Sequence, residues 1–234
     1  MTKINRDQFK LFIDAVSAIV DECRCHIDKK GMSVITVDQH NVAMVFAQIK
    51  VKGLPELTPG INVKRLSYFL KMIKSEEVDI SFKKVGEKDV MIVSGDKRTV
   101  KSTLILDAML KTDPNPPKFE TPFSVSISGL EFVRAIKESV SLSDKVRFVF
   151  ADGLFCLQTT DEDKNEVSIN LGENVTSGEA QSLFSDTYLK KMIKPIKKDD
   201  MLSLYANQDH PFKLSFSRDN VNVTYLQAPR IEAD

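Results

Sequence analysis

Apolar residues along this 234-residue chain recur with two different periods. Over residues 6–20 they fall three or four positions apart, which is the spacing of an amphipathic helix. The same spacing returns over three further stretches: 62–74, 130–141 and 185–194. Because Pro195 removes a backbone donor and clashes with the preceding turn, we expect the last helix to stop near Lys194.

Between these helices, apolar and polar residues alternate in short runs, several of them bounded by turns rich in Gly, Asp and Lys, as expected of strands joined by hairpins. The runs that predict strands are 23–28, 32–37, 42–51, 78–83, 89–94, 98–106, 123–127, 145–150, 154–159, 166–171, 201–206, 211–217 and 221–226. Residues 107–121 hold three prolines and no periodic pattern, which predicts an extended connector rather than a helix or a central strand.

The chain repeats itself. Met72-Ile73-Lys74 returns 120 positions later as Met192-Ile193-Lys194, and the order of predicted helices and strands is the same on both sides of the connector. The fold class predicted is therefore α+β with two topologically similar halves, divided into a first domain 1–106, a connector 107–121 and a second domain 122–234.

Charge is segregated although the chain is neutral overall, with 33 basic and 33 acidic residues. The helical segments 6–20, 62–74, 130–141 and 185–198 together hold 13 Lys and Arg but 5 Asp and Glu. Lysine is also an ordinary residue for a solvated helix face. Because the four helices occupy equivalent places in the two repeats and together carry this excess, we favour a surface that meets a polyanion.

Motifs that carry enzyme chemistry are absent from the sequence: no nucleophile motif, phosphate-binding loop or dinucleotide fingerprint is present, and we expect no catalytic residue and no cofactor. The three histidines stand apart, and the Asp161-Glu162-Asp163 cluster is typical of a solvated turn, so we expect no metal. Three cysteines without a CxxC pair, and no signal peptide, indicate a reducing compartment. No apolar run approaches the length of a membrane span.

Two stretches carry a family resemblance. The ending from Tyr225 to Glu232 (YLQAPRIE) resembles the C-terminal signature of the sliding DNA clamps of the proliferating cell nuclear antigen family. The segment from Gly31 to Val42 is similar to the strand, corner and strand in the first half of the same family. The repeat, the connector and the length agree, so the resemblance covers essentially the whole chain, and the short ending is more like that of archaeal clamps.

The resemblance implies a DNA-clamp fold in which each half is an antiparallel sheet with two helices on one face. It also implies that three chains join head to tail into a ring whose hole is lined by the helices and encloses double-stranded DNA without reading its sequence. Family match or helical phase places the following cations toward DNA: Lys10, Lys64, Lys71, Lys74, Arg134, Lys137, Lys191 and Lys194. Ser17 and Tyr68 stand where some relatives carry lysine.

Clamps of this family bind short peptides of their partners under the central connector. Positions that match this pocket are Asn41, Val42, Pro116, Pro117, Phe119, Pro211, Leu226, Gln227, Ala228 and Pro229. Val42 and Leu226 can equally be read as ordinary core residues. The chain also departs from the family, because Gln227 replaces an apolar residue that is common before Ala-Pro and the connector carries few aliphatic side chains.

The family's ring contact pairs the last strand of the first half with a strand in the second half of the neighbour, here 98–106 and 166–175. The expected interface residues are Thr99, Lys101, Thr103, Ile105, Val167, Ile169 and Leu171. A simpler interpretation is that the charges of Lys97, Arg98 and Lys101 merely blunt an exposed edge.

The expected function is thus that of a processivity factor whose partners are DNA, two further copies of itself, a clamp loader, a DNA polymerase, a flap endonuclease and a DNA ligase. Two alternatives stay open: one subunit of a heterotrimeric clamp, or an accessory factor that binds nucleic acid without encircling it. The compartment expected is the cytoplasm, at the nucleoid, for an archaeal chain and the nucleus for a eukaryotic one.

Overall fold

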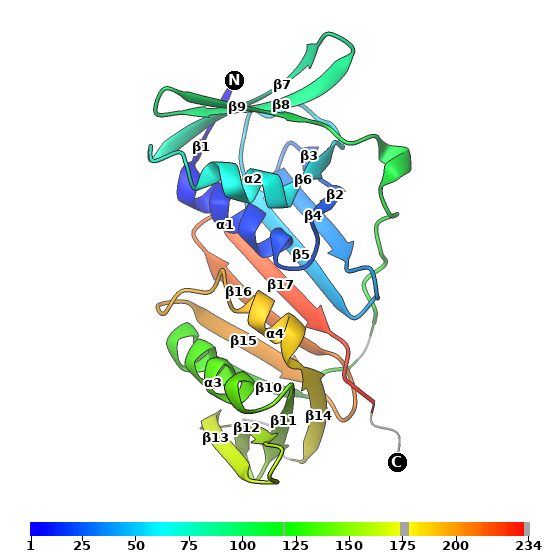
Figure 1. Cartoon of the computed structure of the whole chain (residues 1–234), viewed down its shortest axis with the longest axis vertical. Coiled ribbons are helices and arrows are strands. Elements are labelled where there is room, and N and C mark those ends of the chain that lie inside the picture. The colour runs from blue at the N-terminus through cyan, green and yellow to red at the C-terminus, as the bar shows by residue number, and fades with distance from the viewer. Residues whose placement is uncertain (119, 174–177, 232–234) are drawn as a thin grey trace. The chain divides into compact units, whose positions relative to one another are not determined.

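The computed structural model describes residues 1–118, 120–173 and 178–231. The chain divides into two compact units, the first made of Met1–Asn115 with Arg218–Val223 and the second of Pro116–Ser217 with the residues from Thr224 on. Each unit is built from antiparallel strands and two helices (Figure 1). This is the α+β class that the sequence predicts.

The helices of the described chain occupy the four amphipathic stretches: α1 (Arg6–Ser17), α2 (Val63–Leu70), α3 (Gly129–Leu142) and α4 (Asp186–Met192). The strands of the first unit are β1 (Thr2–Asn5), β2 (Glu22–Arg24), β3 (His26–Asp28), β4 (Gly31–Val37), β5 (Ala43–Lys50), β6 (Gly60–Asn62), β7 (Glu77–Val85), β8 (Lys88–Gly95) and β9 (Arg98–Thr103). Those that follow are β10 (Phe123–Ser128), β11 (Lys145–Ala151), β12 (Leu154–Thr160), β13 (Glu166–Glu173), β14 (Ala180–Ser185), β15 (Met201–Ala206), β16 (Phe212–Arg218) and β17 (Val221–Gln227).

The two units share one topology. In each, the opening strand leads into the first helix and pairs with the strand that follows the second helix: β1 with β7, and β10 with β15. Those sheets continue to β8 and β9 in the first unit and to β16 and β17 in the second. The strands between the two helices pair in the order β3-β4-β5 and as β2-β6 in the first unit, and in the order β13-β12-β11-β14 in the second.

Side chains at the helix starts satisfy amides that have no partner inside the helix. The carboxamide oxygen of Asn5 accepts hydrogen bonds from the amides of Asp7 (3.0 Å) and Gln8 (3.1 Å) before α1. Before α3, Ser128 Oγ accepts from the Glu131 amide at 3.2 Å and donates to the Glu131 carboxylate at 2.7 Å. Local sequence therefore fixes where these two helices begin.

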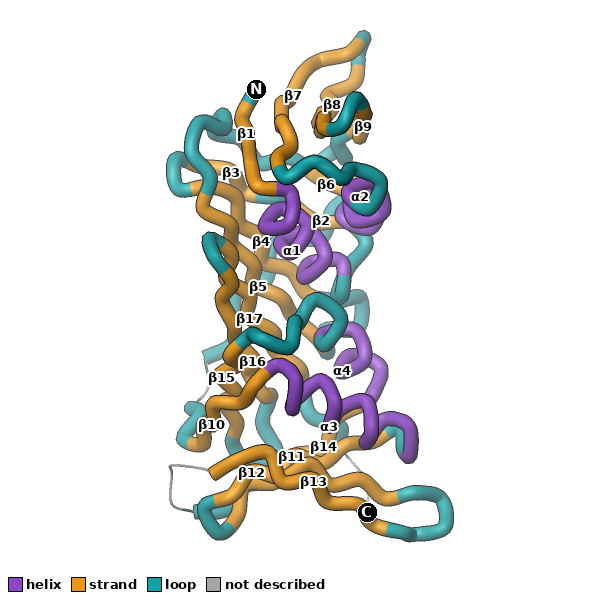
Figure 2. The backbone as a smooth tube through the Cα atoms, turned by 90° about the vertical axis from the view of Figure 1, so that its left-hand side faces the viewer, coloured by secondary structure: helices purple, strands orange, loops and turns teal. Residues whose placement is uncertain are grey.

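Both units bury aromatic cores under their helices. Phe9 and Phe12 of α1 are fully buried in the first unit. In the second, the Phe148 ring centroid lies 4.8 Å from that of Phe184 and 5.1 Å from that of Phe212. Figure 2 shows α1 beside α2 on one face of the first unit and α3 beside α4 on one face of the second.

Helix ends differ from the sequence-based bounds. We expected a helix to Lys74, but α2 ends at Leu70 and the next residues form a turn in which the Met72 amide donates to the Phe69 carbonyl at 3.0 Å. The carboxylate of Asp96, from the turn between β8 and β9, accepts from the Lys74 amide. A tertiary contact therefore ends the helix before its apolar pattern does. α1 and α4 also end earlier than predicted.

Three strands, β1, β6 and β14, were not predicted. In β1 only Ile4 is buried, and on β14 the inward positions begin with the small residues Ala180 and Ser182, so the apolar alternation is weak. Two other expectations were wrong: the run 98–106 is a strand only to Thr103, and residues 107–109 of the connector form one turn of 3-10 helix.

Burial separates the cysteines into two classes. Burial raises the pKa of the Cys23 thiol to about 12, with the nearby Asp113 carboxylate adding to the shift, and it also raises the pKa of Cys25. Because the thiolate is the reactive form, brief treatment with N-ethylmaleimide near pH 7.5 should modify only the half-buried Cys156. Intact-mass spectrometry should show one adduct on the native chain and three after unfolding; two rapid native adducts would contradict this.

Candidate nucleic-acid and peptide interfaces

Two of the expected DNA-facing cations in the first unit are held by carboxylates. Lys10 pairs with Asp14 one turn along α1, and Asp14 also accepts a 2.5 Å hydrogen bond from Ser67 of α2. Lys64, near the start of α2, pairs with Asp21 at 2.7 Å. Each of these cations therefore presents a near-neutral pair rather than a free positive charge.

Two cations at the end of α2 differ from these. Lys71 and Lys74 are exposed, and within the described chain neither ammonium group makes an ion pair. The turn after α2 holds them, since the Asp96 carboxylate accepts from the Lys74 amide. They are the cations of the first unit best placed to meet an anion.

The second unit repeats this division. Arg134 donates to the Glu138 carboxylate one turn along α3 at 2.7 Å, and this contact raises the pKa of the arginine. Lys191 lies over the ring of Tyr188, with 5.3 Å between Nζ and the ring centroid. Lys137 and Lys194 are exposed and, among the described residues, have no carboxylate partner.

A buried carboxylate builds the corner between β4 and β5. Asp38, whose exposed fraction is 4%, accepts hydrogen bonds from the amides of His40 (2.9 Å), Val42 (2.7 Å) and Ala43 (2.8 Å). Asn41 adopts a left-handed backbone with φ of 58°, which asparagine tolerates better than most residues. Asp38 thus leaves Asn41 exposed and Val42 half-buried on the surface of the first unit.

The end of β17 places two expected pocket residues on opposite faces. Leu226 is half-buried, whereas Gln227 is fully buried and donates from Nε2 to the Ser185 carbonyl at 3.0 Å. Gln227 therefore points into the second unit. Having glutamine there, instead of the apolar residue common in the family, changes the interior of the unit and not the face that carries Leu226. Ala228 and Pro229 follow as half-buried residues.

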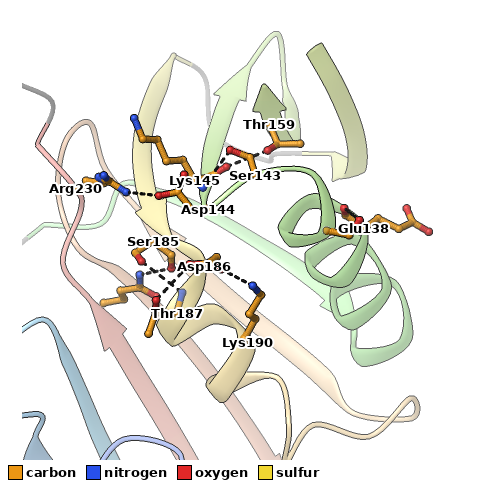
Figure 3. A network of polar contacts seen from close by, with 12 residues as sticks. Glu138, Ser143, Asp144, Lys145, Thr159, Ser185, Asp186, Thr187, Lys190 and Arg230 are labelled. Atoms are coloured by element: carbon orange, nitrogen blue, oxygen red, sulfur yellow. Dashed lines mark hydrogen bonds and ion pairs between the residues drawn. The ribbon is translucent and has the colours of Figure 1, made fainter. Parts of the chain in front are cut away.

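Beyond Pro229 the chain is fastened to the second unit. The Arg230 amide donates to the Leu183 carbonyl at 2.7 Å, and its guanidinium pairs with Asp144 at 3.0 Å. Figure 3 shows Arg230 reaching Asp144, with Asp186 and Lys190 of α4 close by. Three other expected pocket residues are described, with Pro116 and Pro117 exposed and Pro211 half-buried; Phe119 lies outside the described residues.

The two strands expected at the ring contact are both at sheet edges within their units. β9 ends the order β1-β7-β8-β9, and β13 begins the order β13-β12-β11-β14. On β9, Thr99, Lys101 and Thr103 are exposed. On β13, Val167 is exposed and Ile169 and Leu171 are half-buried.

Ile105 differs from the other expected interface residues. It lies beyond the end of β9, and its amide already donates to the Gly60 carbonyl of the same chain at 2.8 Å. Its backbone donor is therefore used inside the first unit.

Comparison with known proteins gives the family. No protein-family model matches the chain. A curated DNA polymerase sliding clamp of Methanocorpusculum labreanum is 34% identical over 244 residues, covering 99% of this chain and 98% of the relative. The clamp of Methanothrix thermoacetophila is 35% identical over 241 residues with the same coverage. The chain belongs to the DNA polymerase sliding clamp family.

Solved structures agree with this clamp assignment. The structure described as the C-terminal region of FEN-1 bound to A. fulgidus PCNA aligns with a TM-score of 0.90 and 27% identity over 100% of this chain and 99% of that one. PCNA from Thermococcus kodakaraensis aligns at 0.83 with 19% identity, over 98% of this clamp and 99% of that chain, and shows the shared fold. The clamp fold expected from the resemblance is confirmed.

Sequence reasoning overlooked the residues that organise these surfaces in the clamp. Asp14 and Glu138 follow their basic partners at four-residue spacing, a signal that was present in the sequence. No comparable spacing in the sequence identifies Asp38 as an acceptor of backbone hydrogen bonds. In the described part of the clamp, no group of three His, Cys, Asp or Glu could hold a metal ion, and no helix could cross a membrane.

Proposed function

We propose that three copies of this chain join head to tail into a ring around double-stranded DNA, and that the ring tethers replication and repair enzymes without itself catalysing a reaction. The observation that carries the proposal is kinship with DNA polymerase sliding clamps over 99% of the chain. The chain would act where its DNA lies, at the nucleoid of an archaeal cell.

Charge on the two sheet edges supports head-to-tail contact. The turn and strand at β9 carry Lys97, Arg98 and Lys101, whereas the turn before β13 and its first residue carry Asp161 to Asp163 and Glu166. Opposite charges favour pairing of β9 with the β13 of a neighbour, and like charges oppose β9–β9 or β13–β13 pairing. An edge that pairs with a neighbour also loses its tendency to aggregate.

The DNA-facing role rests on the exposed cations of the helices and of the turns that follow them. Phosphate contacts carry no sequence information and weaken with salt, which suits a ring that must slide. We propose that Lys71, Lys74, Lys137 and Lys194 make the main contacts and that the carboxylate-paired Lys10, Lys64 and Arg134 contribute less.

We also propose that the residues under the connector capture partner peptides. In this proposal, the connector is the segment 107–121, and it joins domain 1–106 to domain 122–234. The relative whose structure is described as PCNA bound to the C-terminal region of FEN-1 supports this role. By the same kinship we propose a flap endonuclease, a DNA polymerase, a DNA ligase and the clamp loader as partners. Leu226, Pro229 and Val42 would supply apolar contact to the peptide.

The first experiment measures the native mass, which tells how many chains assemble. Light scattering on a sizing column, across a dilution series, should give about 79 kDa, three times the 26.4 kDa chain, for a closed ring. A monomer at every concentration would contradict the homotrimer. It would favour one subunit of a heterotrimeric clamp, or the factor that does not encircle DNA.

DNA topology then separates encirclement from simple binding. A fluorescent clamp threaded onto linear duplex should be retained when both ends are blocked with streptavidin and lost when one end is free. Equal retention on blocked and open duplex would contradict the ring.

A further inference from the structure

The chain that leaves the first sheet is fastened to the first unit along its length. After β9, the Ile105 amide donates to the Gly60 carbonyl at 2.8 Å, and a side chain at position 60 would come within 2.5 Å of the Ile105 carbonyl oxygen. Glycine is therefore needed at position 60 for this close approach. We call the residues that follow, 107–113, the strap.

One arginine makes most of the contacts to the strap. The Arg24 side chain, 12% exposed, donates from Nε to the Asp107 carboxylate and from Nη2 to the Asp107 carbonyl at 3.1 Å. Its Nη1 donates to the Lys111 carbonyl and lies 3.9 Å from the Asp113 carboxylate. Because three nitrogens of one planar group reach three residues of the strap, lysine could not reproduce the arrangement.

The pKa values agree with a charge-assisted contact. Hydrogen bonding to Arg24 lowers the pKa of the Asp107 carboxyl below its usual value, and the same contact raises the pKa of the guanidinium. Because the pKa of Asp107 is lowered, its contact with Arg24 contributes fully to stability at any pH above the ordinary pKa of an aspartate. The contribution is lost only as the pH falls through the lowered value. The contact is therefore complete at neutral pH.

A second anchor joins the strap to the corner built by Asp38. The Lys111 ammonium donates to the carbonyl of Asp38 at 3.1 Å and to that of Gln39 at 3.3 Å. Asp38 is also the residue whose carboxylate holds the Val42 amide. The strap and the surface residues Asn41 and Val42 thus share one support.

A histidine completes the fastening at the far end of the strap. His26 Nε2 lies 2.6 Å from the Asp113 carboxylate, and its Nδ1 lies 3.4 Å from the Thr58 hydroxyl. From Pro114 to Lys118, no side chain makes a hydrogen bond or an ion pair with the described chain. The fastened part of the connector therefore ends at Asp113.

We propose that Arg24 and Lys111 are positioning residues for peptide capture: they fix the strap and the Asp38 corner in one arrangement before a partner peptide binds, so that neither has to be ordered on binding. This inference rests on the proposed peptide capture. Ordering a mobile segment opposes binding, so a pre-fixed strap strengthens affinity and slows dissociation.

The test measures a fluorescein-labelled peptide of the FEN-1 C-terminal region binding to the full chain, by anisotropy and stopped flow. Arg24→Lys and Lys111→Ala should each weaken binding by about fivefold, mainly through faster dissociation. Amide exchange should accelerate at residues 107–113, while native mass stays unchanged. Lys111→Arg, which keeps donors to the two carbonyls, should restore most of the affinity.

Lys52→Ala is the matched control, because Lys52 is an exposed lysine of the first unit that lies outside the connector and, among the described residues, makes no hydrogen bond or ion pair. Its affinity should stay within about twofold of the unaltered chain, well below the effect of losing an ordered segment. Faster exchange in the strap with unchanged peptide affinity would overturn the inference alone. Absence of binding to the unaltered chain would overturn peptide capture, and the inference with it.

Discussion

We expect that replacing Leu226 and Pro229 with alanine abolishes the proposed peptide capture and leaves the proposed ring assembled. Leu226 is half-buried on the face of β17 opposite to Gln227, so its side chain is available to a ligand on that face. Burying one aliphatic anchor contributes about 1.5–3 kcal/mol, and a loss of that size weakens binding by a factor of about 10 to 150. Titration calorimetry with the FEN-1 peptide should therefore show no measurable heat of binding for the double variant.

Gln227→Leu is the control for this experiment. Gln227 is fully buried and, within the described residues, its Oε1 has no hydrogen-bond partner, so leucine removes one unsatisfied acceptor and one bond to the Ser185 carbonyl. Peptide affinity should stay within about twofold, since the side chain points into the unit. Unchanged affinity in the Leu226 and Pro229 double variant would remove the pocket assignment.

We expect that alanine at Lys71, Lys74, Lys137 and Lys194 removes most of the proposed attraction to DNA. These four ammonium groups are exposed and, in the described part of the chain, unpaired, so each is available to a phosphate. Removing one lysine–phosphate interaction should flatten the plot of log affinity against log salt concentration by about 0.9. Anisotropy with a short duplex at salt concentrations between about 50 and 200 mM measures this slope.

The matched comparison replaces Lys10, Lys64 and Arg134, which sit at equivalent helices but are paired with Asp14, Asp21 and Glu138. Removing the basic member of such a pair leaves an uncompensated carboxylate but takes away no free cation. The slope of log affinity against log salt concentration should therefore change far less. Asp14→Asn should raise affinity, because it frees Lys10. Equal losses in the two alanine sets would show that helix position, rather than pairing, selects the contacts.

Amphipathic spacing was enough to find all four helices, because each must bury one stripe of apolar residues. It could not place the end of α2, since the Asp96 carboxylate that holds Lys74 lies 22 residues further along the chain. The alternation pattern did not predict β14, because Ser182, a polar residue, occupies an inward position on this strand. The local pattern therefore identifies the helices, whereas distant contacts fix where they end and local alternation misses strands in which it is weak.

The candidate interfaces also combine features that the sequence reveals with features that depend on tertiary contacts. Lysines, the C-terminal signature and the four-residue pairs could be read directly, but other contacts that control these surfaces join distant residues. Arg24 and Asp107 are 83 positions apart, and Lys64 and Asp21 are 43 apart. No periodic pattern marks such pairs, and they depend on the strand order that a single sequence does not state.

The unpaired edges of β9 and β13 also bear on how clamps with different subunits can arise. In the proposed ring, each chain joins its neighbours through two separate edges of opposite charge, so one edge can change while the other is kept. After a gene duplication, a substitution on one edge alone would leave a copy still able to join its sibling on one side but no longer on the other. Successive changes of this kind would set a fixed subunit order, with one defined place for each enzyme that a specialised copy attracts.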